Sequence, residues 1–311
     1  MRYISLCSGI EAASVAWGPL GWAPICFSEV EEFPSEVLRQ RFPDVPNVGD
    51  VTTYDWSKYR GAADVVVFGS PCTSFSVAGL RKGLDDPKGR VMLSCLEAAR
   101  SIRPRWVVIE NVPALLSSHR GEDFQRLLET MAGFWPGGGI SWRVLRSEFF
   151  GLAQQRQRLF VVVSTGSTVG AEKVLLDEEG SGRASQACGE RWKELAERAG
   201  VSARDEGWCL ASAQAHAELV TGGLSPTLTT LHEAPIWIHP DGGDWVVRRL
   251  TPDEYEVLMG FERGWTRIAW KGRPPERCPD NRRYRAVGNS FPVPIIRWIG
   301  ERIREVDALI S

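Results

Sequence analysis

A cysteine at position 72 follows a short apolar run and is flanked by proline and hydroxyl residues. The run, residues 64–68 (DVVVF), has the length and β-branched composition of a buried strand, and the tripeptide GSP leads from it into Cys72. A cysteine just beyond the carboxyl end of a strand, near a helix N-terminus, lies in a field that favours the thiolate. The pattern therefore predicts that Cys72 is a nucleophile. Three other cysteines fit inert core positions better: Cys7, Cys26 and Cys95.

Charged side chains border two further apolar runs. Glu110 and Asn111 directly follow residues 106–109 (WVVI), and a carboxylate there would face the same sheet edge as Cys72, in position to donate or accept a proton. Arg156 and Arg158, in QQRQR, precede the run 159–163 and point to one side if the segment is extended. On these residues alone, the two arginines could equally be ordinary surface side chains.

A third group of residues is typical of a nucleoside site. The first predicted strand ends in Cys7-Ser8-Gly9, and a glycine there lets a ligand approach backbone N–H groups, although a single glycine does not make a dinucleotide fingerprint. Glu29 follows at the end of the second predicted strand, and Asp50 falls where a third strand would end. Acidic residues at two successive strand ends indicate a nucleoside cofactor, with surface carboxylates as the alternative.

The elements that must position these residues alternate between strands and helices. Residues 3–6, 23–27, 64–68, 106–109 and 159–163 are predicted strands, and 31–41, 91–101 and 123–131 are predicted helices. This order predicts a doubly wound α/β domain. We expect it to span residues 1–165 and to be completed by residues 286–311, while 166–285 form a small, irregular, strand-containing domain.

The pattern of the second domain is weaker. A helix is predicted over 190–199, and short strands over 235–239 and 245–247. Thr251, Pro252 and Glu254 form a capping box that begins a helix running to about Met259, and an amphipathic helix is predicted over 295–310.

Composition limits the class of protein. Of 311 residues, 43% are hydrophobic and 24% charged, and seven cysteines without a CxxC pair accompany four histidines without metal spacing. No apolar run approaches the roughly 20 residues that span a bilayer. We therefore expect reduced thiols, no metal, no membrane segment, no obligatory protein partner and a monomer in the cytoplasm.

Charge is segregated along the chain. Residues 165–247 carry 13 Asp and Glu against six Lys and Arg, whereas residues 248–311 carry nine against 13. The stretch 263–285 interleaves eight basic residues with aromatic ones, which suits a phosphate backbone. On this pattern alone, a solvated, loop-rich surface is an equal alternative.

Taken in order, five segments resemble the cytosine-C5 DNA methyltransferases of bacteria and phages. They are SPCTSFS, ENV, QQRQR, RRLTPDEYEVLMGF and RAVGNSFPVP. The resemblance implies a DNA (cytosine-5-)-methyltransferase of the EC 2.1.1.37 type, as found in restriction-modification systems, in a prokaryotic cell or a phage-infected host. Double-stranded DNA is the implied partner and S-adenosyl-L-methionine the implied cofactor.

The same resemblance implies a role for each matching residue. Cys72 would add to C6 of a flipped cytosine, Glu110 would engage N3 and the exocyclic amine, Arg158 would hold O2, and Arg156 would support the loop. The implied cofactor residues are Cys7, Ser8, Gly9, Ile10, Glu11, Glu29, Val30, Asp50, Val51, Pro71, Asn289 and Ser290. The implied DNA contacts are Arg267, Arg273, Arg282 and Arg283 of the basic stretch, together with Ser74, Ser76, Arg156, Thr227 and Thr229.

The first loop departs from the family pattern Phe-x-Gly-x-Gly-Gly. Cys7, Gly9, Glu11 and Ala12 occupy the corresponding places. Glu11 could therefore either reach the methionine ammonium or crowd the site.

Two alternatives remain. An RNA methyltransferase of the same fold would carry Cys-Phe-Thr and a proline pair before the nucleophile, and this chain has neither near Cys72. A catalytically silent DNA-binding relative would be expected to lose Cys72, Glu110 or Arg158, and all three are present.

Overall fold

We describe the chain from a computed structural model that covers residues 1–70, 87–176, 208–211, 218–220, 225–228, 236–241 and 244–310. Contacts divide it into two compact units. The first comprises Met1–Leu145, Arg158–Glu178 and Ile296–Ser311, and the second comprises Arg146–Gln157 and Glu179–Ile295. The boundaries differ from those expected in three places, because residues 146–157 and 286–295 belong to the second unit and residues 166–178 to the first.

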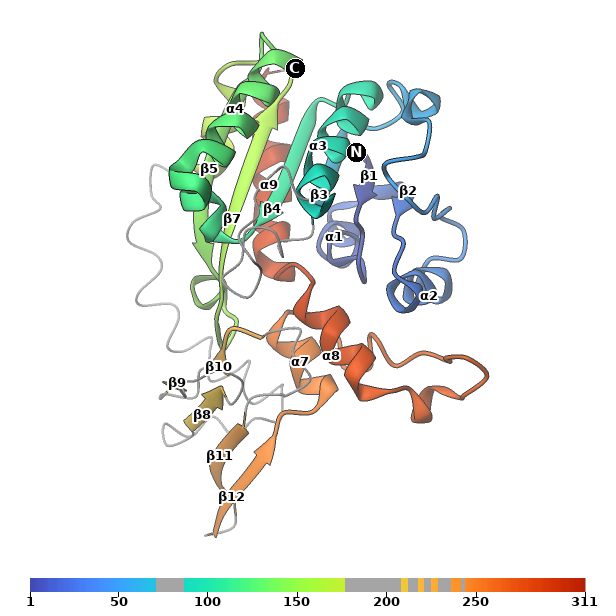
Figure 1. Cartoon of the computed structure of the whole chain (residues 1–311), viewed down its shortest axis with the longest axis vertical. Coiled ribbons are helices and arrows are strands. Elements are labelled where there is room, and N and C mark those ends of the chain that lie inside the picture. The colour runs from blue at the N-terminus through green and yellow to red at the C-terminus, as the bar shows by residue number, and fades with distance from the viewer. Residues whose placement is uncertain are drawn as a thin grey trace. The chain divides into compact units, whose positions relative to one another are not determined.

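The first unit contains a six-stranded mixed sheet in the order β2-β1-β3-β4-β7-β5 (Figure 1). Its strands are β1 (Arg2–Leu6), β2 (Ala23–Ser28), β3 (Val65–Gly69), β4 (Trp106–Asn111), β5 (Gly139–Arg146) and β7 (Gln157–Ser164). β1 to β4 are parallel to one another, and β7 is antiparallel to β4. This arrangement confirms the predicted α/β class and the five predicted strands.

Helices cover both faces of this sheet. They are α1 (Ala12–Trp17), α2 (Glu32–Arg41), α3 (Pro87–Ile102), α4 (Glu122–Phe134), α5 (Gly170–Leu175) and α9 (Val293–Ile310). Alternate residues of β1, β4 and β7 pack with α3 and α4 in one apolar core. On the other face the Trp17 ring of α1 contacts Tyr3 of β1, and its Nε1 donates to the Ile296 carbonyl of α9 at 2.8 Å.

Two sequence predictions on this unit need correction. No strand precedes Asp50: an isolated bridge between Phe27 and Asn47 is the only β pairing nearby among the described residues, so the chain runs from there into a turn. Strand β5 was not predicted, because its sequence GISWRVLR is too polar to read as a buried strand.

The second unit is built from short elements. They are β6 (Gln154–Gln155), β8 (Trp208–Ala211), β9 (Glu218–Val220), β10 (Ser225–Pro226), β11 (Ile236–Asp241), β12 (Asp244–Arg249), α7 (Pro252–Leu258) and α8 (Asp280–Gly288). β12, β11, β8 and β9 form an antiparallel sheet, and β10 pairs with β6. The capping box at Thr251 and Glu254 is confirmed, and the helix predicted over 190–199 lies outside the described residues. No helix in the described part of the chain is long and apolar enough to cross a membrane.

Candidate active site

One edge of the six-stranded sheet collects the polar residues that the sequence singled out in the first unit. Because β1 to β4 are parallel, their carboxyl ends meet at this edge, and the antiparallel β7 begins there. The register pairs Gly69 with Glu110 and Asn111 with Leu159, which places the end of β4 between the end of β3 and the start of β7.

Glu110 and Arg158 form an ion pair at this edge. Arg158 Nε lies 3.0 Å from Glu110 Oε1, and their side chains are only 13% and 10% exposed. A carboxylate and a guanidinium held together with little solvent can present both an acceptor and several donors to a planar polar ligand. The structure thus joins two residues that lie 48 positions apart in the sequence.

Asn111, the neighbour of Glu110, links the end of β4 to the end of β3. Its Oδ1 accepts from the Val112 N–H at 2.8 Å, and its Nδ2 donates to Ser70 Oγ at 3.2 Å. Ser70 is the last described residue before the segment that carries four predicted site residues. These residues, Pro71, Cys72, Ser74 and Ser76, lie outside the described part of the chain.

The first loop is tied to the end of β2 by one carboxylate. Glu29 Oε2 accepts from the Gly9 N–H at 2.8 Å, and Oε1 accepts from the Glu31 N–H at 2.7 Å. Burial raises the pKa of Glu29, and these backbone hydrogen bonds offset part of that rise. Ser8 joins the same ends, since its N–H donates to the Ser28 carbonyl at 3.1 Å.

The surroundings of Glu29 fit a nucleoside. Gly9 has a positive φ of 56°, and the space that a β-carbon would occupy there is open, so a ligand can approach the backbone. Each Glu29 oxygen can accept a second hydrogen bond, as from a ribose hydroxyl. Val30 is 66% exposed beside it, which leaves an apolar side chain free to contact a base.

Four other residues predicted to bind the cofactor differ from one another in burial. Ile10 and Val51 are buried in the core, and the Val51 carbonyl accepts from Trp56 Nε1. Cys7 is half-buried, with its Sγ 3.9 Å from Cys95 Sγ. Asp50 is exposed, and its Oδ1 accepts from the N–H and the hydroxyl of Thr52.

Glu11 is a correction to the predicted cofactor contacts. Its side chain is fully buried, and Oε1 accepts from the N–H and the hydroxyl of Ser14 at 3.1 Å each, which caps α1. One carboxylate oxygen therefore caps the helix start, while the other, Oε2, is buried with no hydrogen-bond partner among the described residues. Burial raises its pKa to about 7.

This pKa predicts a pH-dependent stability. Because the folded-state value lies above the ordinary 4.5, the stabilisation is fully present below about pH 4.5 and is lost as the pH rises through about 7. The integrated effect is at most about 3 kcal/mol. We expect Glu11→Gln to lack this component, so urea unfolding at about pH 5 and 8 should show a smaller loss of stability with pH than in the wild type. Glu32→Gln, at an exposed position, should keep the wild-type profile.

Arg156 is a second correction, both as a catalytic group and as a DNA contact. It belongs to the second unit and is 1% exposed. Its guanidinium donates to the carbonyls of Leu228, Gly288 and Ser290 at 2.9, 3.0 and 3.0 Å. Arg156 therefore supports the chain around residues 228 and 288–290. The predicted role of Arg156 included such support of a loop.

Other predicted residues surround this arginine. Thr227 Oγ1 donates to the Gln155 carbonyl at 2.5 Å, and Thr229 lies outside the described residues. Asn289 is exposed at the end of α8, and Ser290 is buried. Nothing among these contacts reports on a cofactor, so the roles of Asn289 and Ser290 stay predictions.

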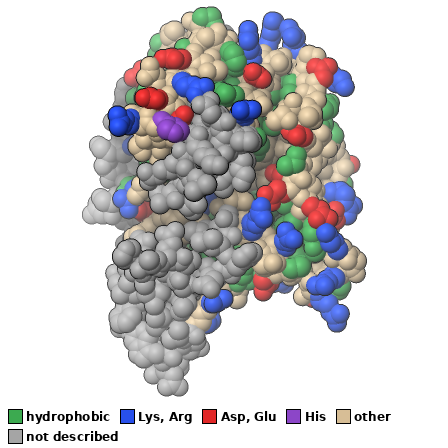
Figure 2. Space-filling model, in the orientation of Figure 1, with side chains coloured by type: hydrophobic (Ala, Val, Ile, Leu, Met, Phe, Trp, Pro, Cys, Tyr) green, Lys and Arg blue, Asp and Glu red, His purple; other side chains and the backbone are tan. Residues whose placement is uncertain are grey.

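The basic stretch 263–285 is mostly exposed. Seven of its eight basic residues are on the surface, and Lys and Arg side chains gather on this part of the molecule in Figure 2. They are Arg263, Arg267, Lys271, Arg273, Arg277, Arg282 and Arg285.

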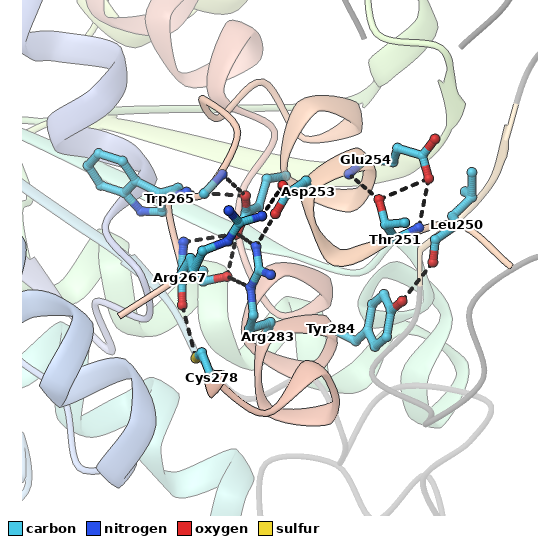
Figure 3. Close-up of polar contacts among 12 residues, drawn as sticks. Leu250, Thr251, Asp253, Glu254, Trp265, Arg267, Cys278, Arg283 and Tyr284 are labelled. Carbon is cyan, nitrogen blue, oxygen red and sulfur yellow. Dashed lines mark hydrogen bonds and ion pairs between the residues drawn. The ribbon is translucent and has the colours of Figure 1, made fainter. Parts of the chain in front are cut away.

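Arg283 is the exception, and it corrects the prediction that this residue contacts DNA. It is 4% exposed, and its Nη2 contacts Asp253 at 2.5 Å and Glu256 at 2.8 Å (Figure 3). Its Nε donates to Thr266 Oγ1 at 3.1 Å. A guanidinium held in this way cannot reach a phosphate.

Glu256 is the centre of this buried cluster, which the sequence analysis missed. Its side chain is fully buried and accepts from the N–H groups of Gly264, Trp265 and Thr266 at 2.6, 3.1 and 2.9 Å. Arg267 pairs with Asp253 at the rim. Burial alone would raise the pKa of Asp253, but Arg283 and Arg267 hold it below its ordinary value. The sequence signal for this cluster was the spacing of Asp253 and Glu256, which lie three residues apart in TPDEYE and so share one face of a helix.

No group of three or more His, Cys, Asp and Glu side chains that could hold a metal ion occurs within the described ranges.

The sheet and its polar edge define a methyltransferase fold. A model of the C-5 cytosine-specific DNA methylase family matches residues 1–187. The chain belongs to this family.

The similar proteins are named as methyltransferases, and one of these names specifies adenine rather than cytosine as the modified base. The chain is 28% identical over 97% of its length to a protein of Escherichia phage P1 named DNA N-6-adenine-methyltransferase, and it spans 61% of that protein. Over 52% of its length it is 31% identical to Type II methyltransferase M.AquIA of Picosynechococcus, covering 71% of it. A solved putative DNA modification methyltransferase of an E. coli prophage shares the fold, with a TM-score of 0.67, 16% identity and 99% coverage of both chains.

Proposed function

We propose that this protein is a DNA (cytosine-5)-methyltransferase that transfers a methyl group from S-adenosyl-L-methionine to a flipped cytosine in duplex DNA. The observation that carries the proposal is the ion pair between Glu110 and Arg158. The pair lies at the sheet edge where β3 ends. After β3, the sequence continues through Ser70 to Cys72. Family membership supports the same activity.

The cofactor would lie at the loop between β1 and α1. S-adenosylmethionine, when bound, supplies an electrophilic methyl group on its sulfonium. Glu29 would accept hydrogen bonds from the ribose hydroxyls, and Val30 would contact the adenine ring. The backbone of residues 7–10, the turn at Asp50 and Val51, and Asn289 with Ser290 are the remaining proposed contacts.

Three side chains would act on the cytosine. The Cys72 thiolate adds to C6, and the electron pair of the C5–C6 bond becomes available at C5. Glu110 engages N3 and the exocyclic amine. Arg158 donates to O2 and stabilises the negative charge that develops in the ring. After methylation, a solvent base takes the C5 proton, the electron pair of the C5–H bond re-forms the C5–C6 double bond, and the C6–S bond breaks, which restores the aromatic ring and the Cys72 thiolate.

DNA would be held by the second unit. The exposed part of the basic stretch, including Arg267, Arg273 and Arg282, supplies phosphate contacts, and the strands of residues 166–285 carry a compact recognition domain for a short target. We place the protein as a monomer in the cytoplasm of a prokaryotic cell or a phage-infected host.

Two other substrates deserve a direct comparison. The name of the phage P1 relative raises N6 of adenine as a second acceptor. Against it, the sequence after β3 reads SPCTSFS, which provides a thiol for attack on cytosine C6. tRNA is the other alternative, because an RNA methyltransferase can share the fold.

The deciding experiment is methyl transfer from labelled S-adenosylmethionine to duplex DNA and, in parallel, to tRNA. Digestion of the DNA to nucleosides separates 5-methylcytosine from N6-methyladenine. We expect label in 5-methylcytosine of DNA alone, and no label with Cys72→Ser. The wild type should also form a covalent adduct with 5-fluorocytosine DNA, since fluorine at C5 cannot leave as a proton.

Cys95→Ser is the matched control, because that buried cysteine lies in α3 and is not assigned a chemical step. Label in adenine or in tRNA, or full activity of Cys72→Ser, would contradict the proposal.

A further inference from the structure

The first unit contains a groove at the sheet edge opposite the candidate active site. It has a volume of about 690 Å³ and lies where α3 and α4 end and where β4 begins. Its lining includes Arg60, Arg100, Arg103, Glu97 and Phe134. In Figure 2, Lys and Arg side chains gather at the top of the view, over the end of α3.

Positive charge dominates this groove. Three guanidinium groups face one carboxylate, that of Glu97. Within the described chain Arg60 and Arg103 have no ion-pair partner, and Arg100 has only the Phe134 ring, 4.7 Å from its guanidinium carbon. By contrast, Arg105 close by pairs with Asp64 and Asp307. Three cations that share one groove repel one another unless an anion lies between them.

The backbone holds the arginines in place. The Gly61 N–H donates to the Ile102 carbonyl at 2.7 Å, which joins the turn that carries Arg60 to the end of α3. Arg103 has a positive φ of 59°, so the chain turns sharply just after the helix. The Arg103 N–H donates to the Ala99 carbonyl at 3.0 Å, which fixes this turn. The backbone positions that carry the arginines are therefore joined by hydrogen-bonded turns and the end of α3.

We propose that this groove binds phosphate groups at a site separate from the cofactor and the target base. Guanidinium groups match the geometry of phosphate oxygens and bind them through paired hydrogen bonds. The four steps along β4 from Trp106 to Glu110 separate the two edges by about 13 Å. The phosphates come either from the backbone of a nucleic acid outside the target site or from a small polyphosphate ligand.

The test uses the full chain and a variant with Arg60, Arg100 and Arg103 all changed to Gln. The matched control changes three exposed basic residues of the same unit to Gln, namely Arg2, Lys173 and Arg304. Inorganic triphosphate and a non-target duplex are each titrated calorimetrically at low salt. We expect the groove variant to bind triphosphate about tenfold more weakly or worse, and the control to bind it as the wild type does. S-adenosylhomocysteine should not displace it.

The duplex arm identifies the source of the phosphate. A weaker affinity and a salt slope smaller by about 0.9 per lost contact point to a nucleic-acid backbone, whereas an unchanged duplex affinity points to a small polyphosphate. Equal triphosphate binding by the groove variant and the wild type would overturn the proposal, as would equal losses in the groove and control variants. The single change Arg60→Gln, in an exposed turn, serves if the triple variant is unstable.

Discussion

Replacing Arg158 by alanine is expected to slow methyl transfer by about 10²–10³-fold, since loss of one donor to a developing negative charge has this cost. The change also leaves Glu110 buried beside an empty position, because the pair is separated by 3.0 Å and has little exposure. Single-turnover rates with labelled cofactor measure the effect without a contribution from product release. Circular dichroism should show a folded protein.

The two residues should act as a unit. If so, Glu110→Gln combined with Arg158→Ala costs much less than the product of the two single effects. Arg105→Ala is the control. Arg105 directly precedes β4, at the end of that strand opposite Glu110, and pairs with Asp64 and Asp307. An active Arg158→Ala variant, or strictly additive effects, would remove the pair from the proposed mechanism.

The second large effect concerns stability. We expect Arg283→Ala to destabilise the second unit by about 3–5 kcal/mol, the usual cost when one partner of a buried ion pair is removed. The reason is that Glu256 and Asp253 lose the same buried cation at once. Urea unfolding followed by tryptophan fluorescence should register the loss, since Trp265 is held in the cluster by a hydrogen bond from its backbone N–H to Glu256.

Arg282 provides the comparison, because it is the exposed neighbour in the same helix. Arg282→Ala should leave the unfolding midpoint unchanged and weaken DNA binding for target and non-target duplexes alike, with a salt slope smaller by about 0.9. If Arg283→Ala instead lowered only the salt slope and kept full stability, the buried cluster would not hold this unit together.

Local chemistry was predictable from the sequence wherever cause and effect lie within a few residues. The strand-helix alternation, the capping box at Thr251 and the position of Glu110 at the end of β4 follow from short patterns. The family motifs were also readable, since each is a contiguous segment.

Partners from distant segments could not be predicted in this way. Arg283 and Arg282 are adjacent and chemically identical, yet one is buried because α8 turns it toward Asp253, 30 residues earlier. Similarly, the carboxylate of Glu11 seemed available to a ligand until its burial and its cap on α1 were known. The strand expected before Asp50 is absent from the described residues, because the single bridge between Phe27 and Asn47 does not hold a longer segment in extended form.

The last helix has a consequence for how the chain is made. In the first unit α9 contacts α1 through the Trp17 hydrogen bond to Ile296, and a β-carbon at Gly300 would lie 2.4 Å from Trp17 Nε1. Trp106 of β4 and Arg105 likewise contact Asp307. During synthesis the part of this face that α9 covers stays open until α9 leaves the ribosome, whereas the second unit is nearly complete by then. The order of synthesis therefore favours folding of the inserted unit before the sheet that surrounds it in sequence is closed.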